Sequence, residues 1–147
     1  MTDEYSLDDI EKDDWHIAGD KPNPRTRVTK YNAKPTVIDG YRFDSKAESR
    51  HYLYLRGELE AGYIADLEPR PKPIILIDPF IDNEGALVRA ITYKPDFMYT
   101  HVATGLTVIE DVKGGKATQT QLFRLKWKLL KLKYREDKTF KLRIVES

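Results

Sequence analysis

The sequence predicts a single α+β (α/β) domain in which a mixed β-sheet is flanked by helices. Two long helical segments are separated by several short runs of β-branched and aromatic residues. The expected order is hairpin, helix, three or four strands, helix and strand. A chain of 147 residues is long enough to bury one core built from these elements, but too short for a doubly wound dinucleotide-binding fold.

The composition excludes several classes of site. Without cysteine, the chain has neither a disulfide framework nor a thiolate metal site, and its three scattered histidines argue against zinc. It has no P-loop and no G-x-G-x-x-G, so no nucleotide cofactor is expected. No apolar run reaches the length of a membrane span, and the acidic N-terminus is unlike a signal peptide. We expect a soluble cytoplasmic protein with no membrane partner.

Residues 1–30 are predicted to form a flexible charged arm, followed by one domain over residues 31–147. Residues 1–20 hold eight acids and one base, whereas residues 21–34 hold five bases and no acid. Such a segment buries too little apolar surface to fold alone. Two other roles stay open. Its basic side chains would contact phosphates: Arg25, Arg27 and Lys30. Its apolar side chains would dock on a partner subunit: Leu7, Ile10 and Trp15.

The folded part is expected to begin with a hairpin and a helix. Asp39-Gly40 stands between the short apolar runs 36–38 and 41–43, the strongest local signal for a β-hairpin. The next segment predicts a helix over residues 46–61 that begins at Ser45 and ends at Gly62.

Glu48 has two interpretations. Ser45 and Glu48 fit a capping box, in which the Glu48 side chain would bond back to the Ser45 amide. Glu48 also begins the stripe that continues at Tyr52, Leu55 and Leu59, where an unpaired carboxylate is costly. A metal ion or a donor group would then meet it. His51, nearby, is interpreted as a packed histidine rather than a catalytic base.

Strands follow at residues 63–68, 73–77 and 87–93, with a turn at residues 82–85. The segment from Tyr93 to Gly115 reads as strand, turn and strand, with Thr104-Gly105 in the connection. We expect this hairpin to continue the same sheet.

Three charged side chains of this hairpin are expected to converge. Alternation along the second strand puts Asp111 and Lys113 on one face and Glu110 on the other. Pairing across the turn brings Asp96 beside Asp111. Two adjacent carboxylates favour a divalent ion between them, and oxygen ligands favour Mg²⁺ or Mn²⁺. An edge-strand ion pair is the alternative.

The last part of the chain is basic. Residues 112–147 hold eleven Lys or Arg against three acids, a charge of +8, which leaves −7 for the first 111 residues. A helix is expected over residues 119–135, capped by Thr118 and Gln121, and a final strand over residues 140–145. Its expected apolar stripe is Leu122, Leu125, Leu129 and Leu132, flanked by Trp127, Leu130 and Tyr134. The candidate DNA-binding residues are Lys116, Arg124, Lys128, Lys131 and Arg135. A merely solvated basic face is the alternative.

The motifs resemble those of the PD-(D/E)XK nucleases, and more narrowly of a small phage and prophage family among them. They are Asp39-Gly40, Phe43-Asp44-Ser45-Lys46-Ala47-Glu48, Tyr93-Lys94-Pro95-Asp96-Phe97 and Glu110-Asp111-Val112-Lys113-Gly114. The resemblance covers about residues 30 to 145 and implies a restriction-endonuclease-like core of helix, three strands, helix and strand. The chain is also similar to phage endonuclease I-type Holliday-junction resolvases. It differs in having Asp111 where they have Glu and a longer gap before Asp96.

The resemblance implies metal-dependent hydrolysis of DNA phosphodiesters, in phage recombination or replication in the host cytoplasm. Glu48, Asp96 and Asp111 would bind one or two Mg²⁺ or Mn²⁺ ions, with the Val112 carbonyl as a further ligand, and Lys113 would assist the attacking water. Glu110 is a weaker candidate for the site than these residues. Branched DNA is the expected substrate, and a homodimer the expected form. Two alternatives stay open: a nuclease of ends or single strands, and a DNA-binding protein without activity. Clustered carboxylates argue against the last.

Overall fold

An Asp-Gly hairpin opens the folded part of the chain. The computed structural model describes residues 35–114 and 118–146, so the arm predicted for residues 1–30 lies outside the described residues. β1 (Thr36–Ile38) pairs antiparallel with β2 (Tyr41–Phe43). Between them, Asp39 and Gly40 have φ angles of 52° and 82°, the left-handed conformation that a two-residue turn of this kind requires. The hairpin prediction is confirmed.

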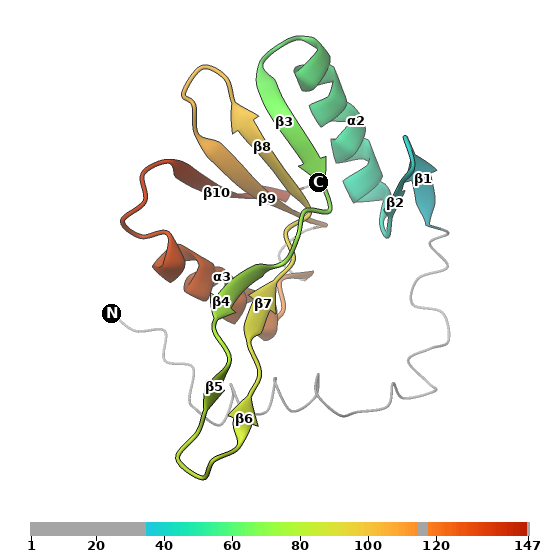
Figure 1. Ribbon diagram of the computed structural model, residues 1–147. Coiled ribbons are helices and arrows are strands. Elements are labelled where there is room, and N and C mark those ends of the chain that lie inside the picture. The colour runs from blue at the N-terminus through green and yellow to red at the C-terminus, as the bar shows by residue number, and fades with distance from the viewer. Residues whose placement is uncertain (1–34, 115–117, 147) are drawn as a thin grey trace.

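The first helix begins at the predicted residue and ends one residue before the predicted end. α2 (Lys46–Glu60) is capped by Ser45, whose Oγ accepts a hydrogen bond of 3.1 Å from the Glu48 backbone N–H. Gly62 follows the helix with a φ of 81°, a conformation that glycine adopts without strain. The N-terminal turn of α2, which contains Glu48, lies next to β2 of the hairpin (Figure 1).

A four-stranded sheet forms the centre of the fold, in the order β10-β9-β8-β3 (Figure 1). β3 (Ile64–Pro69), β8 (Phe97–His101) and β9 (Thr107–Lys113) pair antiparallel, and β10 (Phe140–Glu146) runs parallel to β9. A parallel pair needs a crossover connection, which the second long helix supplies. The sheet is therefore mixed, as predicted, and the fold belongs to the α+β class.

The second long helix is two residues shorter at each end than predicted, and it buries a different face. α3 (Gln121–Lys133) begins two residues later than expected, because Thr120 rather than Thr118 is the cap and accepts a hydrogen bond of 3.1 Å from the Phe123 N–H. The predicted leucine stripe is wrong in phase. The helix turns instead to bury its two large aromatic side chains and one leucine: Phe123, Trp127 and Leu130.

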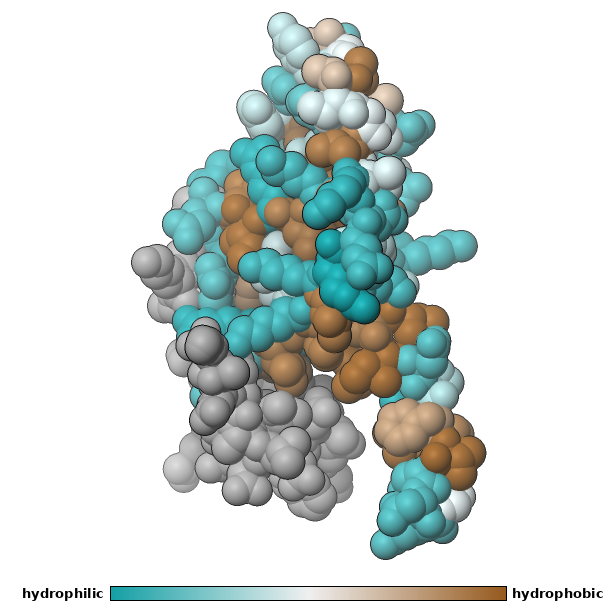
Figure 2. Space-filling model, turned by 90° about the vertical axis from the view of Figure 1, so that its left-hand side faces the viewer, coloured by the Kyte–Doolittle hydropathy of each residue, from teal (hydrophilic) through white to brown (hydrophobic). Residues whose placement is uncertain are grey.

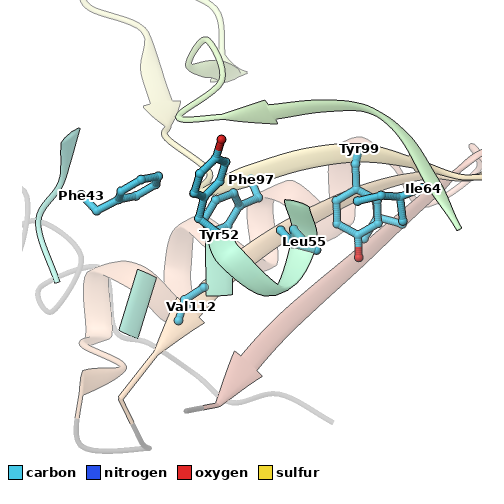
Figure 3. Packing of buried hydrophobic residues seen from close by; sticks show 8 residues of the cluster. Phe43, Tyr52, Leu55, Ile64, Phe97, Tyr99 and Val112 are labelled. Atoms are coloured by element: carbon cyan, nitrogen blue, oxygen red, sulfur yellow. The ribbon is translucent and has the colours of Figure 1, made fainter. Parts of the chain in front are cut away.

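The two helices cover opposite faces of the sheet. On the α2 face, side chains of the hairpin, the helix and the strands pack together: Phe43, Tyr52, Leu55, Ile64, Phe97, Tyr99, Val108 and Val112 (Figure 3). On the other face, Ile109 of β9 packs with Tyr93 and with the buried residues of α3. Because alternate residues of β9 enter these two clusters, the predicted alternation of its faces is confirmed.

A long hairpin leaves the sheet between β3 and β8. β4 (Ile74–Ile77) pairs with β7 (Ile91–Tyr93), and β5 (Phe80–Ile81) pairs with β6 (Leu87–Val88). The prediction that these strands continue the central sheet is wrong. They form two separate two-stranded ribbons that project from the body (Figure 1). Ile74 and Leu76 instead pack against the α3 cluster. We call residues 74–93 the hairpin arm.

No helix within the described ranges is long and apolar enough to cross a membrane.

Candidate active site

Asp111 lies on β9 at the centre of a small buried cluster. Tyr93 donates a hydrogen bond of 2.5 Å to Asp111 Oδ2, and Lys113 Nζ lies 2.9 Å from Oδ1. The ammonium group also stands 4.0 Å above the ring of Phe123. Although Lys113 is close, Oδ1 is buried and receives no hydrogen bond of normal geometry from the described residues. Such an oxygen is costly unless a further cationic or donor group meets it.

Asp96 lies next to Asp111, as the sequence predicts. The Asp96 backbone N–H donates to the Glu110 carbonyl at 3.1 Å, and the Val112 N–H donates to Asp96 Oδ2 at 2.8 Å. These two bonds fix Asp96, which precedes β8, against β9. Burial first and the Asp111 carboxylate second raise the pKa of Asp96 to about 7, against the opposing hydrogen bond from Val112.

Glu48 approaches the same region from α2. Burial raises the pKa of Glu48, with Asp44 and, more weakly, Asp111 acting in the same direction. The capping box is only half formed in the described residues. The Glu48 N–H donates to Ser45 Oγ, but the return bond from the Ser45 amide to the Glu48 carboxylate is missing. The Ser45 side chain also hydrogen-bonds to the Glu48 carboxylate and lowers its pKa, against the larger effects of burial and Asp44.

The three carboxylates do not yet form a coordination shell. Within residues 35–114 and 118–146, no three His, Cys, Asp or Glu side chains are grouped closely enough to hold a metal ion. Oδ2 of Asp111 instead accepts from Tyr93 and Oδ2 of Asp96 from Val112, whereas Oδ1 of Asp111 has only the Lys113 ammonium nearby. The chemistry of the set still suits a hard cation. The donors are all oxygen, one of them is buried and unsatisfied, and two of the carboxylates have raised pKa values that a cation would lower.

Two open pockets meet at Asp96. One, of about 390 Å³, is lined by Glu48, Asp96, Arg70, Lys94 and neighbouring residues. The other, of about 350 Å³, lies between Asp96, Asp111, Lys113 and the first turns of α3. Lys94 and Asp96 line both. A phosphate group in either pocket would lie close to the Lys94 ammonium group and to the carboxylates of the site.

Several residues around the site were not predicted. Arg70 has a φ of 52°, and its guanidinium donates to the Arg42 carbonyl at 2.6 Å and lies 3.5 Å from Asp44 Oδ2. The position of Arg70 depends on how β3 folds, and no local sequence pattern predicts that. Tyr93 and Lys94 are adjacent to the Pro95-Asp96 motif, so the motif itself was the available signal for them.

The candidate DNA-binding residues of α3 are solvent-exposed. Arg124, Lys128, Lys131 and Arg135 lie at helical spacing along one side of the helix and its end, whereas Lys116 lies outside the described residues. The first turns of α3 line the Asp111 pocket. From Arg124 to Arg135 the stripe runs away from that pocket over about 16 Å, given the rise of an α-helix.

Glu110 faces away from this site, as predicted. It is fully buried on the α2 side of the sheet, where His51 Nε2 lies 2.6 Å from Oε2 and Tyr99 donates to Oε1. Arg143 Nη1 lies 3.7 Å from Oε1. His51 is therefore a packed histidine. Glu110 and its three partners thus link α2 to β8, β9 and β10. Strand alternation alone did not reveal this role of Glu110.

A comparison with protein families shows to which family the chain belongs. Residues 28–146 match the family model described as "Protein of unknown function (DUF1064)". The chain belongs to the DUF1064 family. No curated protein and no solved structure matches it. The matched residues include every candidate catalytic residue and the whole of the described sheet.

Proposed function

We propose that the chain is a divalent-metal-dependent endodeoxyribonuclease with a restriction-endonuclease-like core. The observation that supports this most is the meeting of Asp96, Asp111 and Lys113 at one end of the sheet, with Glu48 of α2 beside them. The elements α2, β3, β8, β9, α3 and β10 also follow the order of helix, three strands, helix and strand that the superfamily shares.

Asp96 and Asp111, with Glu48 and the Val112 carbonyl, would hold Mg²⁺ or Mn²⁺. A bound ion of this kind lowers the pKa of a coordinated water and offsets charge on a phosphoryl oxygen. The protein's own part is positioning. The Tyr93 hydroxyl holds Asp111 Oδ2 from the α3 side, and the Val112 amide holds Asp96. Both carboxylates are thereby kept beside each other despite their repulsion.

Lys113 supplies the positive charge of the site. Its Nζ is 2.9 Å from Asp111 and packs on Phe123, so the amine has a defined place beside the reacting phosphate. From there it would orient the attacking water and stabilise the charge that develops on a non-bridging oxygen. Arg70 and Lys94, which line the neighbouring pocket, would contact the flanking phosphates.

The proposed substrate is DNA, branched DNA in particular, and the proposed working form is a homodimer. The exposed basic residues of α3 provide contacts to the phosphate backbone. A chain with one set of ligands cuts one strand at a time, so symmetric resolution of a junction needs two sites related by a twofold axis.

The experiment is a comparison of substrates. Purified protein with Mg²⁺ or Mn²⁺ is assayed on linear duplex, single-stranded, flap and four-way junction DNA of matched sequence. Preferential cleavage of the junction by paired nicks supports the resolvase-like proposal. Equal cutting of all duplex forms removes the preference for branches. Cutting confined to single strands or ends favours the second kind of nuclease, and binding without cleavage favours the inactive DNA-binding protein.

A further inference from the structure

The hairpin arm exposes an unusual amount of apolar surface. Side chains on both of its ribbons are between 36% and 67% exposed: Ile75, Ile77, Phe80, Ile81 and Leu87. Figure 2 shows hydrophobic residues gathered along the projection below the body of the molecule, and hydrophilic residues at its end. Together the five side chains, which lie on both faces of the ribbons, expose an apolar area on the order of 500 Å².

The backbone of the arm is also incompletely paired. β4 pairs only with β7, and β5 only with β6, among the described strands. Each strand therefore has one edge of N–H and C=O groups without a strand partner in that part of the chain. Two-stranded ribbons are marginally stable alone, and exposed apolar edges act as templates for another strand. The arm has the properties of a surface that another protein covers.

Charge is distributed unevenly along the arm. Its turn carries two acids, Asp82 and Glu84, and Asp82 shapes the turn by accepting bonds of 2.9 Å from the N–H groups of Glu84 and Ala86. At the base, Lys72 precedes β4 and Lys94 follows β7, and both are exposed. The acidic tip disfavours a phosphate backbone as the partner, because like charges repel.

We propose that two copies of the chain pair through their hairpin arms, which lie antiparallel across a twofold axis with the tip of each against the base of the other. An isologous interface requires one self-complementary surface, and the antiparallel arrangement meets this condition because it places Glu84 against Lys72 of the second copy. Two arms carry about 1,000 Å² of exposed apolar area between them, which is the lower limit for a specific interface.

The inference does not depend on the proposed chemistry. It does place two copies of the Asp96 region in one particle, because Tyr93 at the end of the arm contacts Asp111 and Lys94 lines both pockets. The arm is thus the element through which the second copy would be held close to each site.

The first test changes the apolar surface. The full chain and the double variant Ile81→Asp/Leu87→Asp are compared by sedimentation velocity over micromolar concentrations. Both side chains are more than 60% exposed, so the fold is expected to remain. Val102→Asp, at a position 53% exposed in the β8–β9 turn, is the matched control. We expect dimers for wild type and control, and for the arm variant a dissociation constant raised by about tenfold or more.

The second test changes the charges in pairs. Glu84→Lys alone places two cations against each other at both ends of the interface, and Lys72→Glu alone places two acids there. Each variant is expected to be monomeric, whereas an equimolar mixture is expected to form heterodimers, since every contact is then between opposite charges. A monomeric wild type, a dimer unchanged in Ile81→Asp/Leu87→Asp, or a mixture that does not associate would overturn the proposal.

Discussion

Among the carboxylates of the site, Asp96 is the one whose ionisation the fold opposes most clearly. Its pKa is about 7 in the folded chain, raised by burial and by Asp111, against 3.8 for an ordinary Asp. In the metal-free protein, this group therefore contributes stability that is fully present below about pH 4 and is lost as the pH rises through 7.

Asp96→Asn should remove that dependence. Asn keeps an oxygen to accept the Val112 N–H but carries no charge. We expect the metal-free variant to be more stable than wild type at pH 8, by on the order of 2–4 kcal/mol, and nearly equal to it at pH 4. Denaturant unfolding at both pH values measures the difference. Mg²⁺ should reduce it at pH 8 by stabilising wild type. A difference that stays constant with pH would contradict the assignment of the repulsion to Asp96.

Glu48→Gln separates the two interpretations of Glu48. The cap bond uses the Glu48 backbone N–H, which the substitution keeps, so the free energy of unfolding should change by less than the roughly 0.5–2 kcal/mol typical of removing a cap. Metal-dependent cleavage should disappear if the carboxylate is a ligand. Ser45→Ala is the control, with lower thermal stability and retained activity. The opposite pattern would return Glu48 to a purely structural role.

The sequence could show the charged residues of the site, but not their full surroundings. Asp96, Asp111 and Lys113 follow from strand alternation and one hairpin, which are local rules. Tyr93, Arg70 and the His51–Glu110–Tyr99 group depend on how distant elements pack, and local patterns do not specify that. The prediction of which face of α3 is buried was wrong for a related reason. Its apolar positions fit more than one stripe, and the volumes of Phe123 and Trp127 decided between them.

At the scale of the element, α3 offers a direct check of that phase. Leu130 is fully buried and Leu132 is 53% exposed. Leu130→Ala should therefore cost about 2–5 kcal/mol of stability, and Leu132→Ala within about 0.5 kcal/mol. Chemical denaturation of the two variants measures this. Equal losses, or a larger loss at Leu132, would restore the stripe predicted from the sequence.

The proposed DNA contacts of the basic side of α3 are tested by the salt dependence of DNA affinity. Lys128→Ala/Lys131→Ala should lower the slope of log K against log salt by about 0.9 for each DNA phosphate that the variant no longer neutralises on duplex DNA. Lys138→Ala/Lys141→Ala, which removes two exposed cations near the start of β10, serves as the matched control. Fluorescence anisotropy at salt concentrations from about 50 to 200 mM, a range over which the affinity changes strongly, gives the slopes. An unchanged slope in the first variant would mean that the stripe is solvated surface.

Elements with strong local signals were predictable, and the hairpin arm was not. Asp39-Gly40, Ser45 and Gly62 each set a boundary by their own conformational preference. Residues 73–77 and 87–93 were predicted as strands, and β4, β6 and β7 lie within these ranges, yet nothing in their alternation says whether they join the central sheet or leave it. Ile74 and Leu76 pack on α3 rather than beside β8, and that choice depends on tertiary packing.

At the scale of the whole molecule, the topology brings the site together. Asp96 precedes β8 and Asp111 lies on β9, α2 presents Glu48 from one face, and α3 encloses Lys113 from the other. The order of elements was predictable from the sequence. The parallel pairing of β10 with β9 was not, because it depends on the handedness and length of the α3 crossover.

The most direct measurement of the central claim is metal-dependent nicking of supercoiled DNA by wild type and by Asp111→Asn. Glu136→Gln, an exposed acid in the turn after α3, is the control. We predict that wild type and control cut with Mn²⁺ or Mg²⁺ and not with EDTA. Asp111→Asn should keep its fold and its DNA affinity and cut at least about a hundredfold more slowly, as expected when a charged group that acts on the transition state is removed. Cleavage by Asp111→Asn at the wild-type rate, or a wild type that never cuts any DNA with either metal, would contradict the account.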